Sequence, residues 1–377
     1  MNEGIDHEAQ PNVDVGVLTR RGRFVDGLRP LSDRRLAVVL VLCLFGGYWL
    51  TMGGHTYSID DEGYLAGARA LAHHTTLLAP TPDIAGTIAV VPHKNGGSTI
   101  ASPIGTLALF TPGVIAGKIF SIPFPDESKQ EAARLIYLST NSLLTALTAG
   151  VLFLLCRALG SSRRSALLLA VAFALGTWAW PHSKTGFSEP GTSLMMTSAL
   201  LALVSHWKRR SLRSAYWVGL FVGCAVITRS SSALFVPILL GAVLSVFDWR
   251  QWRQIGTAAA GFALGGLLPL AAFSMNAWLR FGSPLDSGYS PIPFTTAPLE
   301  GVFGLLLSPG KGLLWFAPIC IVVLFGLRQS FLLQRRYTVV VLLILGAHLA
   351  VYARFAVWSG EAAFGPRYLV PLLPAII

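Results

Sequence analysis

The sequence predicts an all-α, polytopic integral membrane protein with about nine or ten membrane-spanning helices and further juxtamembrane helices on the outer face. Three observations support this class. The chain of 377 residues is 53% hydrophobic and only 12% charged, about half the charge of a typical soluble domain. Its apolar residues fall in runs of roughly 15–25, long enough to cross a bilayer. Its net charge is +11, and its Lys and Arg residues lie mainly in turns between those runs. Such placement orients a protein in a membrane, so the basic charge does not indicate a nucleic-acid partner.

The expected spans follow the chain in order. Residues 1–35 are rich in charge, Gly and Pro, and are expected to form a disordered cytoplasmic tail. The apolar runs expected to cross the membrane are 36–52, 132–156, 166–181, 190–206, 215–228, 233–247, 255–276, 312–327 and 337–353, and another that begins near Tyr368. Residues 36–377 are therefore expected to form a single transmembrane domain, whose last helix is either short or cut off by the end of the sequence.

One apolar run, 104–121, is expected to re-enter the membrane or lie on its surface. Pro103 and Pro112 remove backbone donors from it, and Lys118 is costly in hydrocarbon. If this run does not cross, every basic turn falls on one side, which carries 18 Lys and Arg against 7 Asp and Glu. The other side carries 10 Lys and Arg against 11 Asp and Glu, with Lys118 between them.

The positive-inside rule then places the amino terminus in the cytoplasm. The two long loops, 53–131 and 277–311, face outward, whereas the inner turns are too short to form a pocket. A functional site is therefore expected on the outer, periplasmic face. Short basic inner turns are typical of a bacterial inner membrane.

The densest candidate feature is an acidic cluster in the first outer loop. Asp60, Asp61 and Glu62 follow Ser58, which is expected to cap a surface helix with Tyr64 on its apolar face. One acid near a helix start would satisfy the helix dipole, so three adjacent acids are more than the cap requires. They suit either a general base for a hydroxyl or a ligand of a divalent metal. The histidines of the loop have no ligand partner at helical spacing, so no metal ligands are assigned.

Three cations at the outer ends of spans form a second set. Arg229 interrupts two short apolar runs, Lys311 lies between two glycines, and Arg367 stands at the mouth of the last helix. Each has a plain structural interpretation as an interfacial anchor. Together they suit contacts with the phosphate of a lipid-linked donor.

The outer turn 182–189 contributes a further acid. Glu189 precedes Pro190 at the start of a span, so it is either a helix cap or a second acid that faces the same cavity. Tyr64, His182 and Tyr368 are expected to line that cavity beside the acids.

Four motifs in fixed order occupy residues 36–377. They are Asp60-Asp61-Glu62-Gly63-Tyr64, Ser102-Pro103 followed by Glu131-Ala132-Ala133-Arg134-Leu135, Thr228-Arg229, and Pro366-Arg367-Tyr368-Leu369-Val370-Pro371. In these motifs the chain resembles the polyprenol-dependent membrane glycosyltransferases of the C-type fold, the superfamily of protein O-mannosyltransferases and lipid A aminoarabinose transferase. The first motif is similar to that family's D-E-x-x-[YF]. The chain departs from the family at Ser102, where the family has lysine, and at Gly63, where a basic residue is common.

The resemblance implies a mechanism and its partners. An outer-face Asp deprotonates an acceptor hydroxyl, whose oxygen attacks the anomeric carbon of a sugar on a polyprenyl phosphate, with inversion. In the family's motif the aromatic residue lies four residues after the catalytic Asp, and Tyr64 lies four residues after Asp60, which favours Asp60 as the catalytic residue. If the adjacent Asp61 and Glu62 are matched to the family's D-E pair instead, the catalytic residue is Asp61. The implied partners are a polyprenyl-phosphate-linked sugar, a lipid, glycan or protein hydroxyl, and membrane lipids. No cofactor is assigned, and a divalent metal stays open.

Two other functions fit the same pattern. One is a transporter or flippase of lipid-linked or small substrates, although such a path would favour ionisable groups near mid-membrane and an inverted repeat. The other is a catalytically silent membrane protein that keeps the fold. Only an activity measurement separates the last of these from a transferase.

Overall fold

The computed structural model describes residues 31–75, 86–87, 89–289, 293–361 and 363–377. Within these residues the protein is almost entirely helical, with one two-stranded antiparallel sheet. Most of the expected tail, residues 1–30, lies outside this description, and the first helix begins at Asp33.

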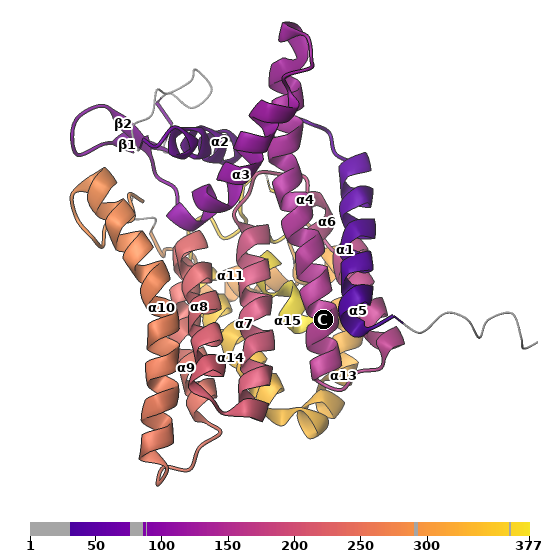
Figure 1. Cartoon of the computed structure of the whole chain (residues 1–377). Helices are drawn as coiled ribbons and strands as arrows, with labels where there is room; N and C mark the ends of the chain where they lie inside the picture. Colours follow the sequence, from indigo (N-terminus) through magenta and orange to yellow (C-terminus); the bar gives the residue numbers. More distant parts are fainter. Residues whose placement is uncertain (1–30, 76–85, 88, 290–292, 362) are drawn as a thin grey trace, which may run out of the picture.

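Most of the helices form a bundle (Figure 1). They are α1 (Asp33–Leu50), α4 (Asp126–Ala158), α5 (Arg163–Gly176), α7 (Glu189–Arg209), α8 (Leu212–Thr228), α9 (Phe235–Leu244), α10 (Trp252–Phe281), α13 (Ile319–Leu333) and α14 (Arg335–Tyr352). The remaining elements are α2 (Ile59–Ala72), β1 (Val90–Pro92), β2 (Ser98–Ile100), α3 (Ile104–Phe120), α6 (Ala179–His182), η1 (Ser230–Leu234), α11 (Pro298–Leu306), α12 (Leu313–Phe316), η2 (Arg367–Leu372) and α15 (Leu373–Ile376).

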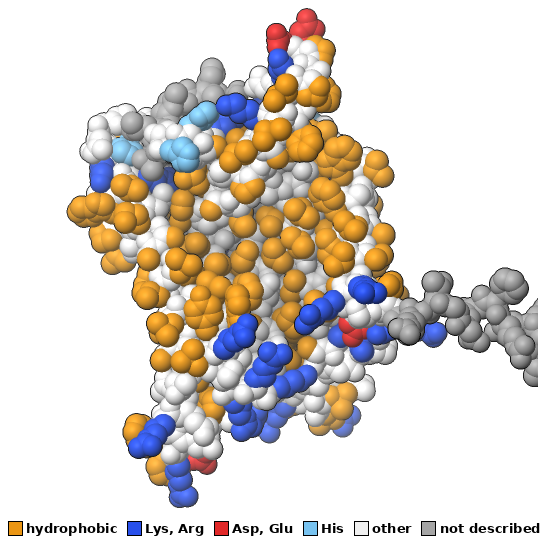
Figure 2. Space-filling model, in the orientation of Figure 1, with side chains coloured by type: hydrophobic (Ala, Val, Ile, Leu, Met, Phe, Trp, Pro, Cys, Tyr) orange, Lys and Arg blue, Asp and Glu red, His pale blue; other side chains and the backbone are white. Residues whose placement is uncertain are grey.

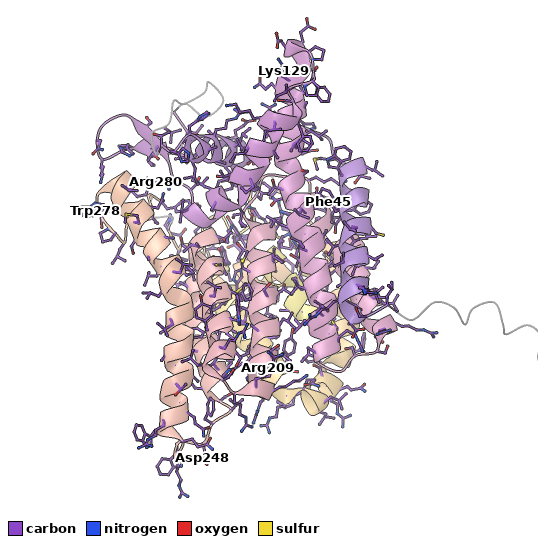
Figure 3. All side chains as sticks on the ribbon, in the orientation of Figure 1. Phe45, Lys129, Arg209, Asp248, Trp278 and Arg280 are labelled. Atoms are coloured by element: carbon purple, nitrogen blue, oxygen red, sulfur yellow. The ribbon has the colours of Figure 1, made fainter. Side chains whose placement is uncertain are left out.

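Three helices of the described chain, α4, α10 and α14, are long and apolar enough to cross a membrane. Shorter apolar helices, of 10–17 residues, include α3, α8 and α13. Figure 2 shows hydrophobic side chains over the middle of the bundle and Lys and Arg gathered at one end. The turn from α7 to α8, with exposed Lys208, Arg209 and Arg210, lies at that end, as Arg209 in Figure 3 shows.

Small residues let neighbouring helices approach closely. A Cβ on Gly219 of α8 would lie 1.9 Å from the carbonyl oxygen of Phe262 on α10, and one on Gly265 of α10 would lie 2.0 Å from that of Tyr216. Glycine at such contacts is a common packing device between membrane helices. The backbones of α8 and α10 are therefore in close contact, and larger residues at these glycines would push the two helices apart.

Helices α2 and α3 lie across one end of the bundle, beside the β1–β2 hairpin (Figure 1). The start of α3 rests on the end of α8, where Thr106 donates to the carbonyl of Thr228 at 2.8 Å. Its far end reaches the first turns of α4, where a Cβ on Gly117 would lie 2.5 Å from the Ala133 carbonyl oxygen. This arrangement agrees with the expectation that 104–121 does not run the length of the bundle.

Candidate functional site

A buried carboxylate, Glu189, forms the centre of the site. It is the first residue of α7 and is fully buried. Arg229 Nη1 lies 2.7 Å from its Oε1, and Arg367 Nε lies 2.5 Å from the same oxygen. A buried charge is stable only when it is paired and hydrogen-bonded, so Glu189 fixes both guanidinium groups in place.

Arg367 extends this cluster to the acidic helix α2. Its Nη2 lies 2.6 Å from Oδ2 of Asp60, whose side chain is 41% exposed. Its guanidinium also stacks over the ring of Phe187, with Cζ 4.1 Å from the ring centroid. The result is a continuous chain of charges, Asp60–Arg367–Glu189–Arg229, that joins α2, η2, α7 and the break between α8 and η1. Of the two acids, Asp60 is the one open to solvent.

Aromatic rings hold Arg229 from the other side. Its Nε donates to the Tyr352 hydroxyl at 3.3 Å, and its Cζ lies 5.2 Å from the ring centroid of Tyr368. The two rings stack with centroids 4.4 Å apart, and Tyr352 in turn donates to Ser231 at 2.8 Å. Sequence analysis predicted Tyr368 in the site and missed Tyr352, which lies at the end of α14 with no motif around it.

The three adjacent acids of α2 point in three directions. Ser58 caps the helix, as expected, by accepting from the Asp61 backbone at 3.2 Å. The Asp61 carboxylate is fully buried and accepts from the backbone N–H groups of Tyr57 at 2.8 Å and Gly186 at 3.0 Å. Burial raises the pKa of Asp61 to about 6. Glu62 lies apart from Arg367 and pairs with Arg134, with Nη2 3.6 Å from Oε1. Only Asp60 therefore joins the arginine cluster.

Lys311 and His182 lie at the edge of this cluster. Lys311 Nζ donates to the backbone carbonyls of Glu361, at 2.7 Å, and Ala363. Burial, together with the positive charge of Arg367, lowers the pKa of Lys311. His182 is buried, and its Nε2 lies 3.0 Å from the carbonyl oxygen of Phe364. Burial lowers the pKa of His182 to about 4, so its ring is neutral near pH 7.

Two tyrosines lie near the acidic side of the cluster. Tyr64, predicted to line the cavity, is buried on α2 and lies near Tyr289. Tyr289 is 46% exposed, close to Asp60 and both arginines. It belongs to the loop 277–311, which was expected to face outward, and nothing in the sequence distinguished it from the rest of that loop.

The ion pairs of the cluster balance in charge, with Arg229 and Arg367 against the carboxylates of Asp60 and Glu189. Lys311 lies near Arg367 as a further cation, and the Asp61 carboxylate lies near that of Asp60. No group of three or more His, Cys, Asp or Glu suited to a metal ion occurs in the described ranges. Chemically, the arrangement provides an open carboxylate beside fixed donors for an anion.

Comparison with known proteins adds no family to this description. No protein-family model matches the chain, and no curated protein matches it. The interpretation of the site therefore depends on its geometry.

Proposed function

We propose that this protein is an integral-membrane glycosyltransferase, which moves a sugar from a polyprenyl phosphate to a hydroxyl on the outer face of the membrane. The observation that carries the proposal is the ion pair between the open carboxylate of Asp60 and the partly buried guanidinium of Arg367. It sets a proton acceptor beside a binding group for phosphate, which are the two parts that this reaction needs. The resemblance to the C-type glycosyltransferases supports the same chemistry.

Asp60 acts as the general base in this proposal. It takes the proton of the acceptor hydroxyl while the oxygen attacks the anomeric carbon of the sugar. The bond from that carbon to the phosphate oxygen breaks, and its electron pair leaves with the lipid phosphate. Asp61 is the weaker candidate, because its carboxylate is fully buried and already accepts two backbone N–H groups. It instead fixes the start of α2 to the turn at Gly186.

Arg367, Arg229 and Lys311 bind the phosphate and stabilise the charge that develops on it. Fixed donors aimed at a developing charge are effective because they need no reorganisation during the reaction. Glu189 positions the two arginines and touches no reacting atom. A phosphate that enters would accept charge-assisted hydrogen bonds from the arginines that now pair with Asp60 and Glu189.

The proposal includes the membrane arrangement. The chain crosses a bacterial inner membrane nine or ten times in a C-type-like fold, with the amino terminus in the cytoplasm and the site on the periplasmic side. The basic end of the bundle in Figure 2 supports this orientation, since Lys and Arg are retained on the cytoplasmic side. Helices α2 and α3 would then lie at the outer surface.

The test uses the full chain in nanodiscs with a panel of polyprenyl-phosphate sugars and candidate hydroxyl acceptors. Release of free polyprenyl phosphate is measured for the wild type, Asp60→Ala and Asp61→Ala. Asp126→Ala is the matched control, because Asp126 is an exposed acid at the start of α4. Release by the wild type and the control, abolished in Asp60→Ala, supports the proposal. A folded wild type that binds these donors but releases nothing favours a transporter or a silent protein.

A further inference from the structure

A second buried arginine lies outside the site described above. Arg280, in the last turn of α10, is only 3% exposed (Figure 3). Its Nε donates to Thr99 at 3.2 Å, and its Nη1 donates to the Ser102 carbonyl at 2.8 Å and the Asn276 side chain at 3.1 Å. Its Nη2 has no hydrogen-bond partner, and none of the ion pairs found among the described residues includes it. A buried cation without a counter-charge is costly, so its presence indicates an anionic ligand.

A second unpartnered group lies beside Arg280. The Ser102 hydroxyl is buried and has no partner either. Because the Ser102 carbonyl accepts from Arg280, its hydroxyl and the open Nη2 belong to the same neighbourhood. Arg280 lines a cleft between α2, β2, α3 and α10, together with the small residues Gly67 and Ala70. The enclosed part of the cleft holds about 20 Å³, which fits one water molecule or a single oxygen of an oxyanion.

An apolar groove shares one lining residue with this cleft. Leu71 at the end of α2 lines both spaces. The groove has a volume of about 560 Å³ and follows one face of α3, where Ala108, Pro112, Ile115 and Ile119 recur at helical spacing. The hydrogen-bond donors of Arg280, which suit one anionic oxygen, therefore lie near an apolar groove that suits a hydrocarbon chain.

We propose that this cleft and groove bind a membrane phospholipid. An oxygen of the lipid phosphate enters the cleft at Arg280, and an acyl chain lies along α3. The site is distinct from the arginine cluster, because the ten residues from Asp60 to Ala70 correspond to about 15 Å along α2. One phosphate therefore cannot occupy both places. The inference does not depend on the proposed transferase activity.

The experiment measures binding of phosphatidylglycerol to the purified full chain in detergent by native mass spectrometry. Arg280→Gln removes the charge, and Ala70→Leu fills the cleft while leaving Arg280 in place. Arg354→Gln is the matched control, since Arg354 is an exposed arginine beyond α14. We expect the affinity for the lipid to fall at least about tenfold in both cleft variants, as for the loss of a charge-assisted hydrogen bond, and to be unchanged in the control.

Thermal unfolding of each variant identifies any variant that fails to fold. If Arg280→Gln fails to fold, Ala70→Leu still tests the proposal. Equal lipid binding by the wild type and folded Ala70→Leu would overturn the proposal. Displacement of the lipid by equimolar inorganic phosphate would overturn it too, because the groove would then contribute nothing. Loss of polyprenyl-phosphate binding in the cleft variants, with phosphatidylglycerol binding retained, would reassign the cleft to the donor.

Discussion

Arg367 and Asp60 stand near opposite ends of the sequence, yet Nη2 of the arginine lies 2.6 Å from Oδ2 of the aspartate. The same guanidinium holds Glu189 through its Nε at 2.5 Å. Arg367 therefore contacts the proposed base and the buried anchor at once. A phosphate that binds Arg367 competes with Asp60 for the same N–H groups, so donor binding and the base share one residue.

The first prediction concerns this shared residue. Arg367→Ala should raise the KM for the donor and lower kcat, each by about tenfold or more, because a charge-assisted contact to the leaving phosphate is lost. Steady-state kinetics across donor concentrations measure both constants. Arg354→Ala, at an exposed arginine, is the control and should behave as the wild type. Unchanged kinetics in Arg367→Ala at ordinary expression would refute a phosphate role for Arg367.

The second prediction concerns the anchor. Glu189→Gln should lower the free energy of unfolding by about 3–5 kcal/mol, since two partly buried arginines lose the buried carboxylate that pairs with both. Denaturant unfolding in detergent micelles measures the change. Glu300→Gln, at an exposed acid of α11, should leave the stability unchanged. Equal stability of the two variants would show that Glu189 does not hold the cluster together.

The third prediction concerns Asp61 and pH. Its pKa rises from 3.8 to about 6 on folding, so between these values the folded chain binds more protons than the unfolded chain. The free energy of unfolding should therefore fall as pH rises from 4 to 6, by about 3 kcal/mol at most, and level off above. Asp61→Asn should remove this slope. A wild type and a variant with parallel profiles from pH 4 to 7 would contradict the assignment.

The sequence predicted the helical class, and the described residues are almost entirely helical. From Pro112 and Lys118 it also predicted that 104–121 re-enters the membrane or lies on its surface. Helix α3 lies across one end of the bundle, and its place relative to a membrane stays a prediction. These features depend on local chemistry, which a single sequence records. The number of spans depends on the membrane as well, and three described helices meet the length and composition required.

Most residues of the site could be predicted from the sequence, but the ion pairs between them could not. Glu189, Arg229 and Arg367 were each candidates with a plausible structural alternative, and only their meeting at one oxygen distinguishes them. The choice between Asp60 and Asp61 depends on the rotation of α2 about its axis. Adjacent helical residues differ in direction by about 100°, so the fold decides which acid faces the arginines.

The most direct test of the central claim compares Asp60→Asn with the wild type in nanodiscs under single-turnover conditions. The rate of sugar transfer and the Kd for the polyprenyl-phosphate sugar are measured together, with Asp126→Asn as the control. Loss of a general base should slow transfer by roughly 10²–10⁴-fold, with no comparable loss of donor affinity. Transfer by Asp60→Asn within about threefold of the wild type, with the donor bound, would contradict the role of Asp60 as the base.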